Sequence, residues 1–405
     1  MKISPLARPF PELPEIDGVR RGVAAAGYKP WTRADVTLLA FDSGTTVAGV
    51  TTQSKCPSPE VELCRRHLAH GRARALVVNA GNSNAFTGLR GAEATATQVA
   101  EAARLLGCEV TEVFAASTGV IGVPLPAAKA VEGVGAAFRA LGTASWLDVT
   151  KAIGTTDTFP KAACRETSIG GVKVKLVGFI KGSGMIAPDM ATMLGFLVTD
   201  AAIPATLLQQ MLAAANAESF SCITVDSDTS TSDTVLAFAT GKAGNQPPAT
   251  LADAGAFAAA LAGLCRDLAQ LVVRDGEGAS RFIEIRVSGA VSDESGHRIA
   301  MSIANSPLVK TAIAGGDANW GRVVMAVGKA GEPADRDRLS IRFGGIEVAA
   351  GGMVVEGYDE APVAAHLAGE EVEIAVDLGL GQGRAQAWTC DLTHGYVSIN
   401  ADYRS

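Results

Sequence analysis

The centre of the chain, residues 178–200, reads Gly-Phe-Ile-Lys-Gly-Ser-Gly-Met-Ile-Ala-Pro-Asp-Met-Ala-Thr-Met-Leu-Gly-Phe-Leu-Val-Thr-Asp. A glycine-rich loop and Pro188 lead into an apolar run that begins near Thr192, and such a run is typical of a buried β-strand. The loop therefore delivers a threonine to the start of a strand. In the simplest interpretation this threonine packs its methyl group and hydrogen-bonds its hydroxyl inside the fold.

The same arrangement suits a chain that cuts itself between Ala191 and Thr192. A flexible loop can bend the Ala191 carbonyl onto the Thr192 hydroxyl, and water can then release the resulting ester. The freed α-amine has an ordinary pKa of about 7.7–8.0 and can activate the hydroxyl beside it. Thr192 would then serve as both nucleophile and base. Spacing alone favours the buried strand threonine over this interpretation.

Outward from this centre, strand-like and helical runs follow one another along the chain. Several strand-like runs alternate apolar and polar residues, which favours antiparallel sheets packed on each other over a doubly wound parallel sheet. We therefore predict a mixed α/β fold of stacked, mostly antiparallel sheets flanked by helices, with no composition break between two independently folding domains. The expected strands cover 75–78, 113–116, 172–177, 282–287 and 372–376, and the expected helices follow Ser58 or cover 92–106, 204–217 and 251–271.

Composition excludes several classes of protein. The 42 acidic and 35 basic residues give a net charge of -7, and no Lys/Arg run indicates a nucleic-acid partner. The amino-terminal segment lacks the apolar core of a signal peptide, and no stretch reaches about 18 uninterrupted apolar residues, so we expect a cytoplasmic protein without a membrane span. Seven cysteines without a Cys-x-x-Cys pair predict free thiols.

Three further patterns have plain interpretations. Asp226-Ser-Asp-Thr-Ser-Thr-Ser-Asp233 lacks the sixth-position glycine and the closing glutamate of a calcium loop, and the histidines lack ligand spacing, so no metal site is expected. His67 and His70 are expected on the solvated face of a basic helix. The run Gly379-Leu-Gly-Gln-Gly383 lacks the remaining spacing of a dinucleotide fingerprint and predicts a hairpin instead.

The segment from Lys181 to Leu194 resembles the autoproteolysis motif of the glutamate N-acetyltransferase family, also called ornithine acetyltransferases. This resemblance favours the self-cleaving interpretation and an N-terminal-nucleophile type of αββα layering. It implies an α chain of residues 1–191 and a β chain of residues 192–405, assembled as a heterotetramer. The resemblance extends along nearly the whole chain, through segments 79–88, 117–122, 155–157, 275–279, 308–313, 319–322, 391–394 and 399–401.

The resemblance also implies a reaction of arginine biosynthesis. Thr192 takes the acetyl group from N2-acetylornithine, ornithine leaves, and glutamate attacks the acetyl-enzyme to give N-acetylglutamate, with no cofactor. Some family members also accept acetyl-CoA as a donor and thereby act as amino-acid N-acetyltransferases, and the residues leave this choice open. The implied roles are oxyanion stabilisation by Thr118 and Gly119, and substrate binding by Thr155, Lys181, Thr192, Glu277, Asn400 and Ser405.

Physical chemistry agrees with two of these roles. Gly119 follows the end of a predicted strand and has no side chain. The backbone at Thr118 and Gly119 can therefore approach a developing oxyanion closely. Glu277 lies between two glycines and can approach the ammonium group of an ornithine side chain. Ser227 and Ser232 depart from the family pattern, in which Gly and Asn are more usual, as does the segment 51–56, and these departures bear on loop shape and donor preference.

Two alternatives remain open from the sequence. An aminopeptidase or amidase with the same N-terminal-nucleophile architecture would use water in place of glutamate as the acceptor. An uncleaved binding protein would keep 178–200 as an ordinary loop and strand.

Overall fold

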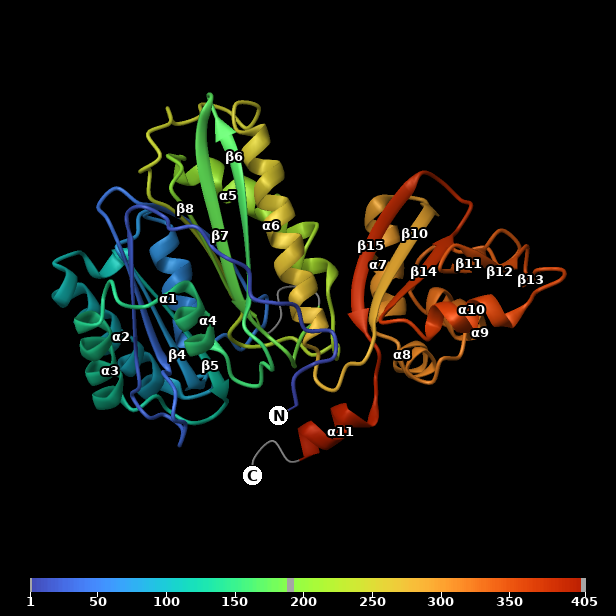
Figure 1. Cartoon of the computed structure of the whole chain (residues 1–405), viewed down its shortest axis with the longest axis horizontal. Coiled ribbons are helices and arrows are strands. Elements are labelled where there is room, and N and C mark those ends of the chain that lie inside the picture. The colour runs from blue at the N-terminus through green and yellow to red at the C-terminus, as the bar shows by residue number, and fades with distance from the viewer. Residues whose placement is uncertain (1, 188–192, 402–405) are drawn as a thin grey trace.

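The computed structural model describes residues 2–187 and 193–401, and its first sheet has four strands (Figure 1). The strand order is β1 (Val19–Ala24), β2 (Val36–Phe41), β4 (Ala75–Asn82) and β5 (Val113–Val120), with only β4 and β5 parallel. Because these two strands run in parallel, their carboxyl ends meet at one edge of the sheet. The helices around this sheet are α1 (Pro59–Leu68), α2 (Gly88–Leu106), α3 (Ala127–Arg139) and α4 (Trp146–Ile153), with a short 3-10 turn at Val110–Glu112.

The second sheet has five strands and includes the chain on both sides of the central loop. Its order is β3 (Thr46–Thr51), β9 (Thr234–Ala239), β8 (Leu194–Thr199), β7 (Val172–Lys181) and β6 (Lys161–Ile169). Only β8 and β9 are parallel in this sheet. Its helices are α5 (Ala205–Ala217) and α6 (Gly255–Arg274), and a 3-10 turn covers Phe220–Cys222.

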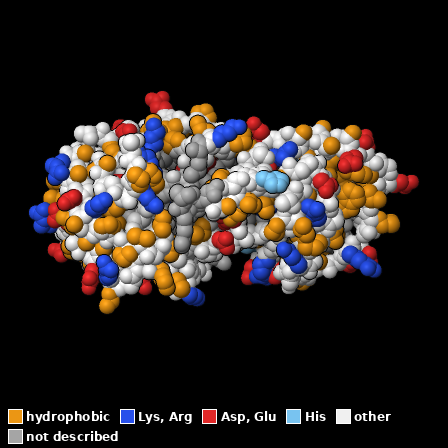
Figure 2. Space-filling model, turned by 90° about the horizontal axis from the view of Figure 1, so that it is seen from below, with side chains coloured by type: hydrophobic (Ala, Val, Ile, Leu, Met, Phe, Trp, Pro, Cys, Tyr) orange, Lys and Arg blue, Asp and Glu red, His pale blue; other side chains and the backbone are white. Residues whose placement is uncertain are grey.

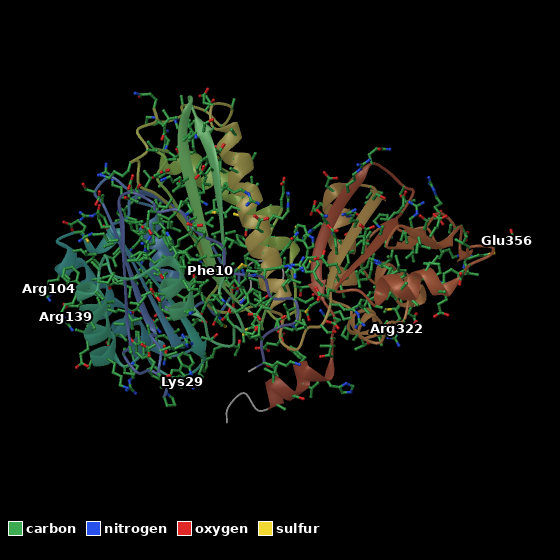
Figure 3. The ribbon with its side chains drawn as sticks, viewed as in Figure 1. Phe10, Lys29, Arg104, Arg139, Arg322 and Glu356 are labelled. Atoms are coloured by element: carbon green, nitrogen blue, oxygen red, sulfur yellow. The ribbon has the colours of Figure 1, made fainter. Side chains whose placement is uncertain are left out.

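The two sheets pack face to face through aromatic side chains. Phe41 of the first sheet stacks on Phe238 of the second with ring centroids 4.4 Å apart, and Phe114 meets Phe238 edge-on at 6.2 Å. Phe10 of the amino-terminal segment packs against this same core (Figure 3). Helices α2 and α3 lie outside the first sheet and α5 and α6 outside the second (Figure 1). The predicted αββα-type layering of mostly antiparallel sheets is therefore confirmed.

Helix α6 is long and apolar enough to span a membrane by length and composition alone. In the fold its apolar side packs on β6 and β7, with Leu261, Leu264 and Leu268 buried. The second sheet thus accounts for the apolar character of this helix. On the face seen in Figure 2, acidic and basic side chains are interspersed and neither sign forms a continuous patch.

A third sheet forms a separate lobe that the sequence did not predict. Among the described residues, those of its hydrophobic core all lie between Ile283 and Ala387. The strand order is β13 (Met353–Val354), β12 (Ile346–Ala350), β11 (Ser340–Phe343), β14 (Glu371–Asp377), β10 (Phe282–Ala290) and β15 (Gly383–Cys390), and the helices are α7 (Asp293–Ala304), α8 (Pro307–Ala314), α9 (Trp320–Gly328) and α10 (Glu360–Leu367). Its strands alternate apolar and polar residues as strands elsewhere in the chain do. Neither alternation nor composition therefore revealed where the lobe begins.

Two local predictions were wrong. Residues 379–383 do not form a hairpin, because β10 lies between β14 and β15 and pairs with both. His67 is buried rather than solvated, and its Nδ1 lies 2.8 Å from the Val113 carbonyl oxygen. The helix that carries His67 begins as predicted, since the Ser58 hydroxyl accepts a hydrogen bond from the Val61 amide.

After the third lobe, α11 (His394–Ala401) lies below the junction between that lobe and the two stacked sheets (Figure 1). None of its residues is buried. Its Tyr396 hydroxyl lies 3.3 Å from an Asp226 carboxylate oxygen, and the Thr393 hydroxyl before it donates to the Gly278 carbonyl. These two contacts join α11 and the residue before it to the loops that carry Asp226 and Gly278.

Candidate active site

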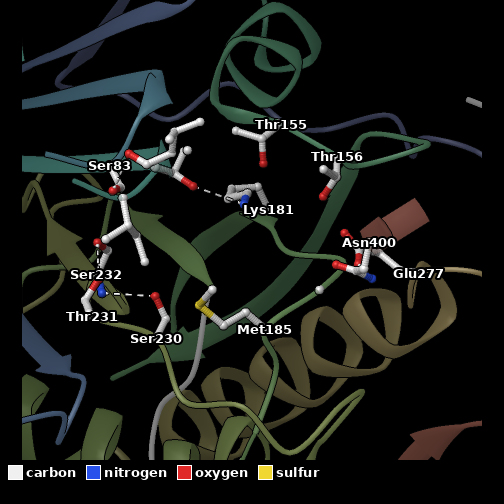
Figure 4. Close-up of a pocket in the computed structure, with 15 residues that line it drawn as sticks. Ser83, Thr155, Thr156, Lys181, Met185, Ser230, Thr231, Ser232, Glu277 and Asn400 are labelled. Carbon is white, nitrogen blue, oxygen red and sulfur yellow. Dashed lines mark hydrogen bonds between the residues drawn. The ribbon is translucent and has the colours of Figure 1, made fainter. Parts of the chain in front are cut away.

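One cavity of about 270 Å³ brings together six of the residues named from the sequence. They come from the end of β5, the loop after α4, the end of β7, the loop after α6, and α11 (Figure 4). The six are Thr118, Gly119, Thr155, Lys181, Glu277 and Asn400. The other three named positions, Ala191, Thr192 and Ser405, lie outside the described residues.

Gly119, the last residue but one of β5, has a backbone conformation that requires glycine. Its φ is +134°, and a Cβ atom there would lie 2.4 Å from the carbonyl carbon of Gly81 on the neighbouring strand. The pairing of β4 with β5 becomes irregular at this point, beside Asn82. A bare backbone segment is therefore exposed at the edge of the sheet and lines the cavity, as an oxyanion site requires.

Lys181 ends β7 and is only 3% exposed. Its ammonium donates a hydrogen bond of 3.1 Å to the Thr118 hydroxyl. Burial lowers the pKa of Lys181, and the nearby Asp157 carboxylate opposes that effect. This places a buried amine with a lowered pKa directly beside Thr118, where it can meet a substrate anion or hold a proton.

A buried ion network lies behind Lys181. The Lys161 ammonium contacts Asp157 at 2.6 Å and Asp275 at 2.5 Å, and the Lys161 and Asp275 side chains are completely buried. Burial alone would raise the pKa of Asp157, but the two lysine ammonium groups hold it well below its usual range. The Asp157 carboxylate also accepts the Thr155 amide at 2.9 Å and the Gly182 amide at 2.8 Å. The network therefore holds the loop that carries Thr155 and the backbone directly after Lys181.

Glu277 is a mostly buried carboxyl group on the opposite side of the cavity from Ser83 (Figure 4). It is 8% exposed and accepts a hydrogen bond of 2.8 Å from the Asn400 amide. Burial raises the pKa of Glu277. Gly184 allows this placement, because a Cβ there would lie 2.5 Å from a carboxylate oxygen of Glu277. A carboxylate in this position suits a ligand ammonium group.

Residues that sequence reasoning did not assign to the site complete the wall of the cavity. Figure 4 shows Lys181 between two groups, with Glu277 and Asn400 on one side and a row of hydroxyl side chains on the other. Ser232, which the sequence marked only as a departure from the family pattern, is in this row, so this position lies in the wall of the cavity. The added residues are Ser83, Val120, Ile121, Thr156, Gly184, Met185, Ser230, Thr231 and Ser232.

The segment that superficially resembled a calcium loop has another role in the structure. Asp226 and Asp233 direct their carboxylate oxygens at backbone amides of residues 185, 186 and 193. Within residues 2–187 and 193–401, no group of three or more His, Cys, Asp or Glu side chains could hold a metal ion. Carboxylates that accept backbone N–H groups have fewer oxygens left for a cation.

Comparison with known proteins agrees with the resemblance drawn from the sequence. The model of the ArgJ family matches residues 20–405. The arginine biosynthesis bifunctional protein ArgJ of Zymomonas mobilis is 65% identical over 100% of this chain and 99% of its own length, and that of Gluconobacter oxydans is 55% identical over 100% and 96%. The crystal structure of the Bacillus halodurans ArgJ protein is 42% identical, covers 50% of this chain and 95% of its own, and has a TM-score of 0.49. The predicted family is thereby confirmed: this chain belongs to the ArgJ family.

Proposed function

We propose that this enzyme of arginine biosynthesis moves an acetyl group from N2-acetylornithine to glutamate through an acetyl ester on Thr192. In this proposal the chain first cuts itself between Ala191 and Thr192, giving chains of residues 1–191 and 192–405 that assemble as a heterotetramer in the cytoplasm. Membership of the ArgJ family supports the proposal, since its relatives bear the name arginine biosynthesis bifunctional protein.

The observation that carries the proposal is the pairing of Leu194 with Lys181 at the wall of the cavity. Leu194 lies two residues after Thr192 in the sequence, so the chain that follows the proposed nucleophile begins beside the buried amine and Thr118. The cavity at this point also holds the Gly119 backbone and the Glu277 carboxyl group.

The proposed cycle uses these groups in a fixed order. The Thr192 hydroxyl attacks the acetyl carbonyl while its proton passes to the α-amine of the same residue. Thr118 and the Gly119 backbone stabilise the tetrahedral oxyanion, and ornithine leaves with the proton. The glutamate amine then attacks the acetyl ester, giving N-acetylglutamate and a free Thr192 hydroxyl. No cofactor takes part in this cycle.

The charges of the cavity suit these two amino acids. Glu277, Asn400 and Thr155 surround a region fit for an ammonium-bearing side chain, and Lys181 supplies a cation for a carboxylate. The hydroxyl row at Ser83 and Ser232 offers uncharged donors and acceptors beside Thr118. We also propose acetyl-CoA as a second donor, which would account for the word bifunctional in the names of the relatives.

The test is glutamate-dependent release of ornithine from N2-acetylornithine by the purified protein. We expect ornithine and N-acetylglutamate to form in equal amounts over many turnovers, and ornithine release to stop after one equivalent per active site when glutamate is withheld. Equal release without glutamate would establish the amidase alternative instead. Replacing N2-acetylornithine with acetyl-CoA in the same assay tests the second donor.

A denaturing gel with amino-terminal sequencing tests the cut. Two fragments of about half length, one beginning Thr-Met-Leu-Gly-Phe, support the proposal. A single full-length band from an active enzyme would contradict it. The variant Thr192→Ala should remain uncut and inactive.

A further inference from the structure

The loop Asp226–Asp233 has a carboxylate at each end, and these two carboxylates hold the chain on both sides of the proposed cut. Asp226 accepts the Met185 amide at 2.6 Å and the Ile186 amide at 2.8 Å. Asp233 accepts the Met193 amide at 2.8 Å. The chain that enters the central segment and the chain that leaves it are therefore bound to the same eight-residue loop.

Each flank has a second anchor from the residues next to these carboxylates. The Ile186 carbonyl accepts the Val225 amide at 2.7 Å and the Thr224 hydroxyl at 3.0 Å. The Met193 carbonyl accepts the Thr234 amide at 3.1 Å. Both Ile186 and Met193 are thus held through their N–H and their C=O, which fixes the orientation of each peptide group as well as its position.

The loop itself is attached to the rest of the fold. The Asp233 carbonyl accepts the Thr52 amide at 3.0 Å, and the Thr52 hydroxyl donates to the Ser230 carbonyl at 2.7 Å. The Thr231 carbonyl accepts the Ser58 amide at 2.8 Å, which joins the loop to the start of α1. Asp233 is completely buried. A loop with these attachments can serve as a rigid support for the two flanks.

We propose that Asp226 and Asp233 are positioning residues for self-cleavage, which set the placement of the chain on either side of the scissile bond. The inference rests on the proposed cut between Ala191 and Thr192. Intramolecular attack requires the hydroxyl oxygen and the carbonyl carbon to approach to about 3–3.5 Å, and a misplacement of about 1 Å can slow a reaction about 100-fold. Fixing both ends of a short segment removes much of its conformational freedom before the attack.

The carboxylates act here as acceptors of backbone N–H bonds. Burial raises the pKa of both Asp226 and Asp233, while the backbone N–H bonds that they accept act in the opposite direction. At Asp233, which accepts one backbone amide, an asparagine side chain places an amide oxygen where that carboxylate oxygen was and can accept the same bond. An alanine side chain cannot.

The test follows self-cleavage of the full chain after cell-free synthesis, by the half-life of the full-length band on a denaturing gel. We expect Asp233→Ala and Asp226→Ala to lengthen this half-life about 100-fold. Asp233→Asn should restore cutting to within about threefold of the natural chain, because its oxygen replaces the lost acceptor. The natural chain must yield a fragment beginning Thr-Met-Leu-Gly-Phe.

A matched control is Asp200→Ala. Asp200 is also a buried carboxyl group that accepts one backbone amide, that of Lys175 at 2.8 Å, but it lies at the other end of β8. Melting temperatures of Asp200→Ala and Asp233→Ala should fall by similar amounts, while only the second variant loses cutting. Equal slowing by both would assign Asp233 a merely structural role.

Three outcomes separate the inference from the proposal on which it rests. A natural chain that is never cut overturns the proposed function. A natural chain that is cut, with Asp226→Ala and Asp233→Ala cutting equally fast, overturns this inference alone. Asp233→Asn as slow as Asp233→Ala would also overturn it, since the carboxylate would then act through its charge or its proton. If Asp233→Ala does not fold, the partly exposed Asp226 supplies the comparison through its Ala variant against Asp200→Ala.

Discussion

The Lys181 ammonium donates a hydrogen bond of 3.1 Å to the Thr118 hydroxyl, and the two residues are 63 positions apart in the chain. This bond joins the end of β7 in the second sheet to the end of β5 in the first. It therefore crosses the two stacked sheets at the edge where the cavity opens. Any displacement of the sheets relative to each other moves Thr118 away from the buried amine.

The first prediction concerns Thr118. We expect Thr118→Val to lower kcat for acetyl transfer about 100–1000-fold with little change in KM, because one donor to a developing oxyanion is worth roughly that factor. Self-cleavage passes through an oxyanion of the same kind and should slow as well. Steady-state kinetics with N2-acetylornithine and glutamate provide the measurement. A variant with raised KM and natural kcat would assign Thr118 to ground-state binding instead.

The second prediction concerns the space at Gly184. The variant Gly184→Ala places a methyl group 2.5 Å from a Glu277 carboxylate oxygen, so the carboxyl group must move away from Asn400. We expect KM for N2-acetylornithine to rise at least about tenfold, the effect of losing one hydrogen bond to a charged group. Gly255→Ala is the control, since no atom lies within 4 Å of its added Cβ and its backbone tolerates alanine. An unchanged KM in Gly184→Ala would remove Glu277 from the substrate site.

The third prediction concerns pH. Burial raises the pKa of Glu277, so its carboxylate takes up a proton at a higher pH than an ordinary glutamate of pKa 4.5. Since only the ionised form attracts an ammonium group, KM for N2-acetylornithine should rise as pH falls toward this raised pKa and level off at higher pH. The variant Glu277→Gln should have a high KM at every pH, without the rise at low pH. If KM depended on pH in the same way in the natural enzyme and in Glu277→Gln, Glu277 would not be the group that binds the ammonium.

The fourth prediction concerns the buried cation. Lys161→Met removes the ammonium that pairs with Asp157 and Asp275 and leaves two carboxyl groups in the interior. We expect the free energy of unfolding to fall by about 3–5 kcal/mol, measured by denaturant titration. Arg104→Ala is the control, because Arg104 pairs with Glu101 on the outer surface of α2 (Figure 3) and such exposed pairs add little stability. Equal losses in the two variants would refute the structural role of the network.

Much of the site could be predicted because its residues lie in short, unusual segments of sequence. A strand followed by Ser-Thr-Gly indicates a backbone approach at Thr118 and Gly119, and a glutamate between glycines indicates close contact at Glu277. Spacing alone did not bring these segments together. The resemblance did so, and the structure places six of the residues around one cavity. Ser83 and Ser232 were missed because a serine in a loop has no local pattern that separates a cavity wall from a solvated turn.

The sequence by itself determined the layered α/β fold, since the alternation of apolar and polar residues depends only on which face of each strand is buried. It also identified the family, and it identified the segment around Thr192 as one that resembles the autoproteolysis motif of that family. Only the tertiary structure decided which charges are buried together. Lys161 and Asp275 lie 114 positions apart, and their contact depends on how α6 packs against β6.

Tertiary structure also decided what the carboxylates of the loop Asp226–Asp233 contact. The sequence argued against a calcium loop here but assigned these carboxylates no partner. The fold places Met185, Ile186 and Met193 against them, and an unpaired backbone N–H in that position must find an acceptor. Burial of these carboxylates is not encoded by any local sequence pattern. It places Asp226 and Asp233 where they bind the backbone on both sides of the central segment.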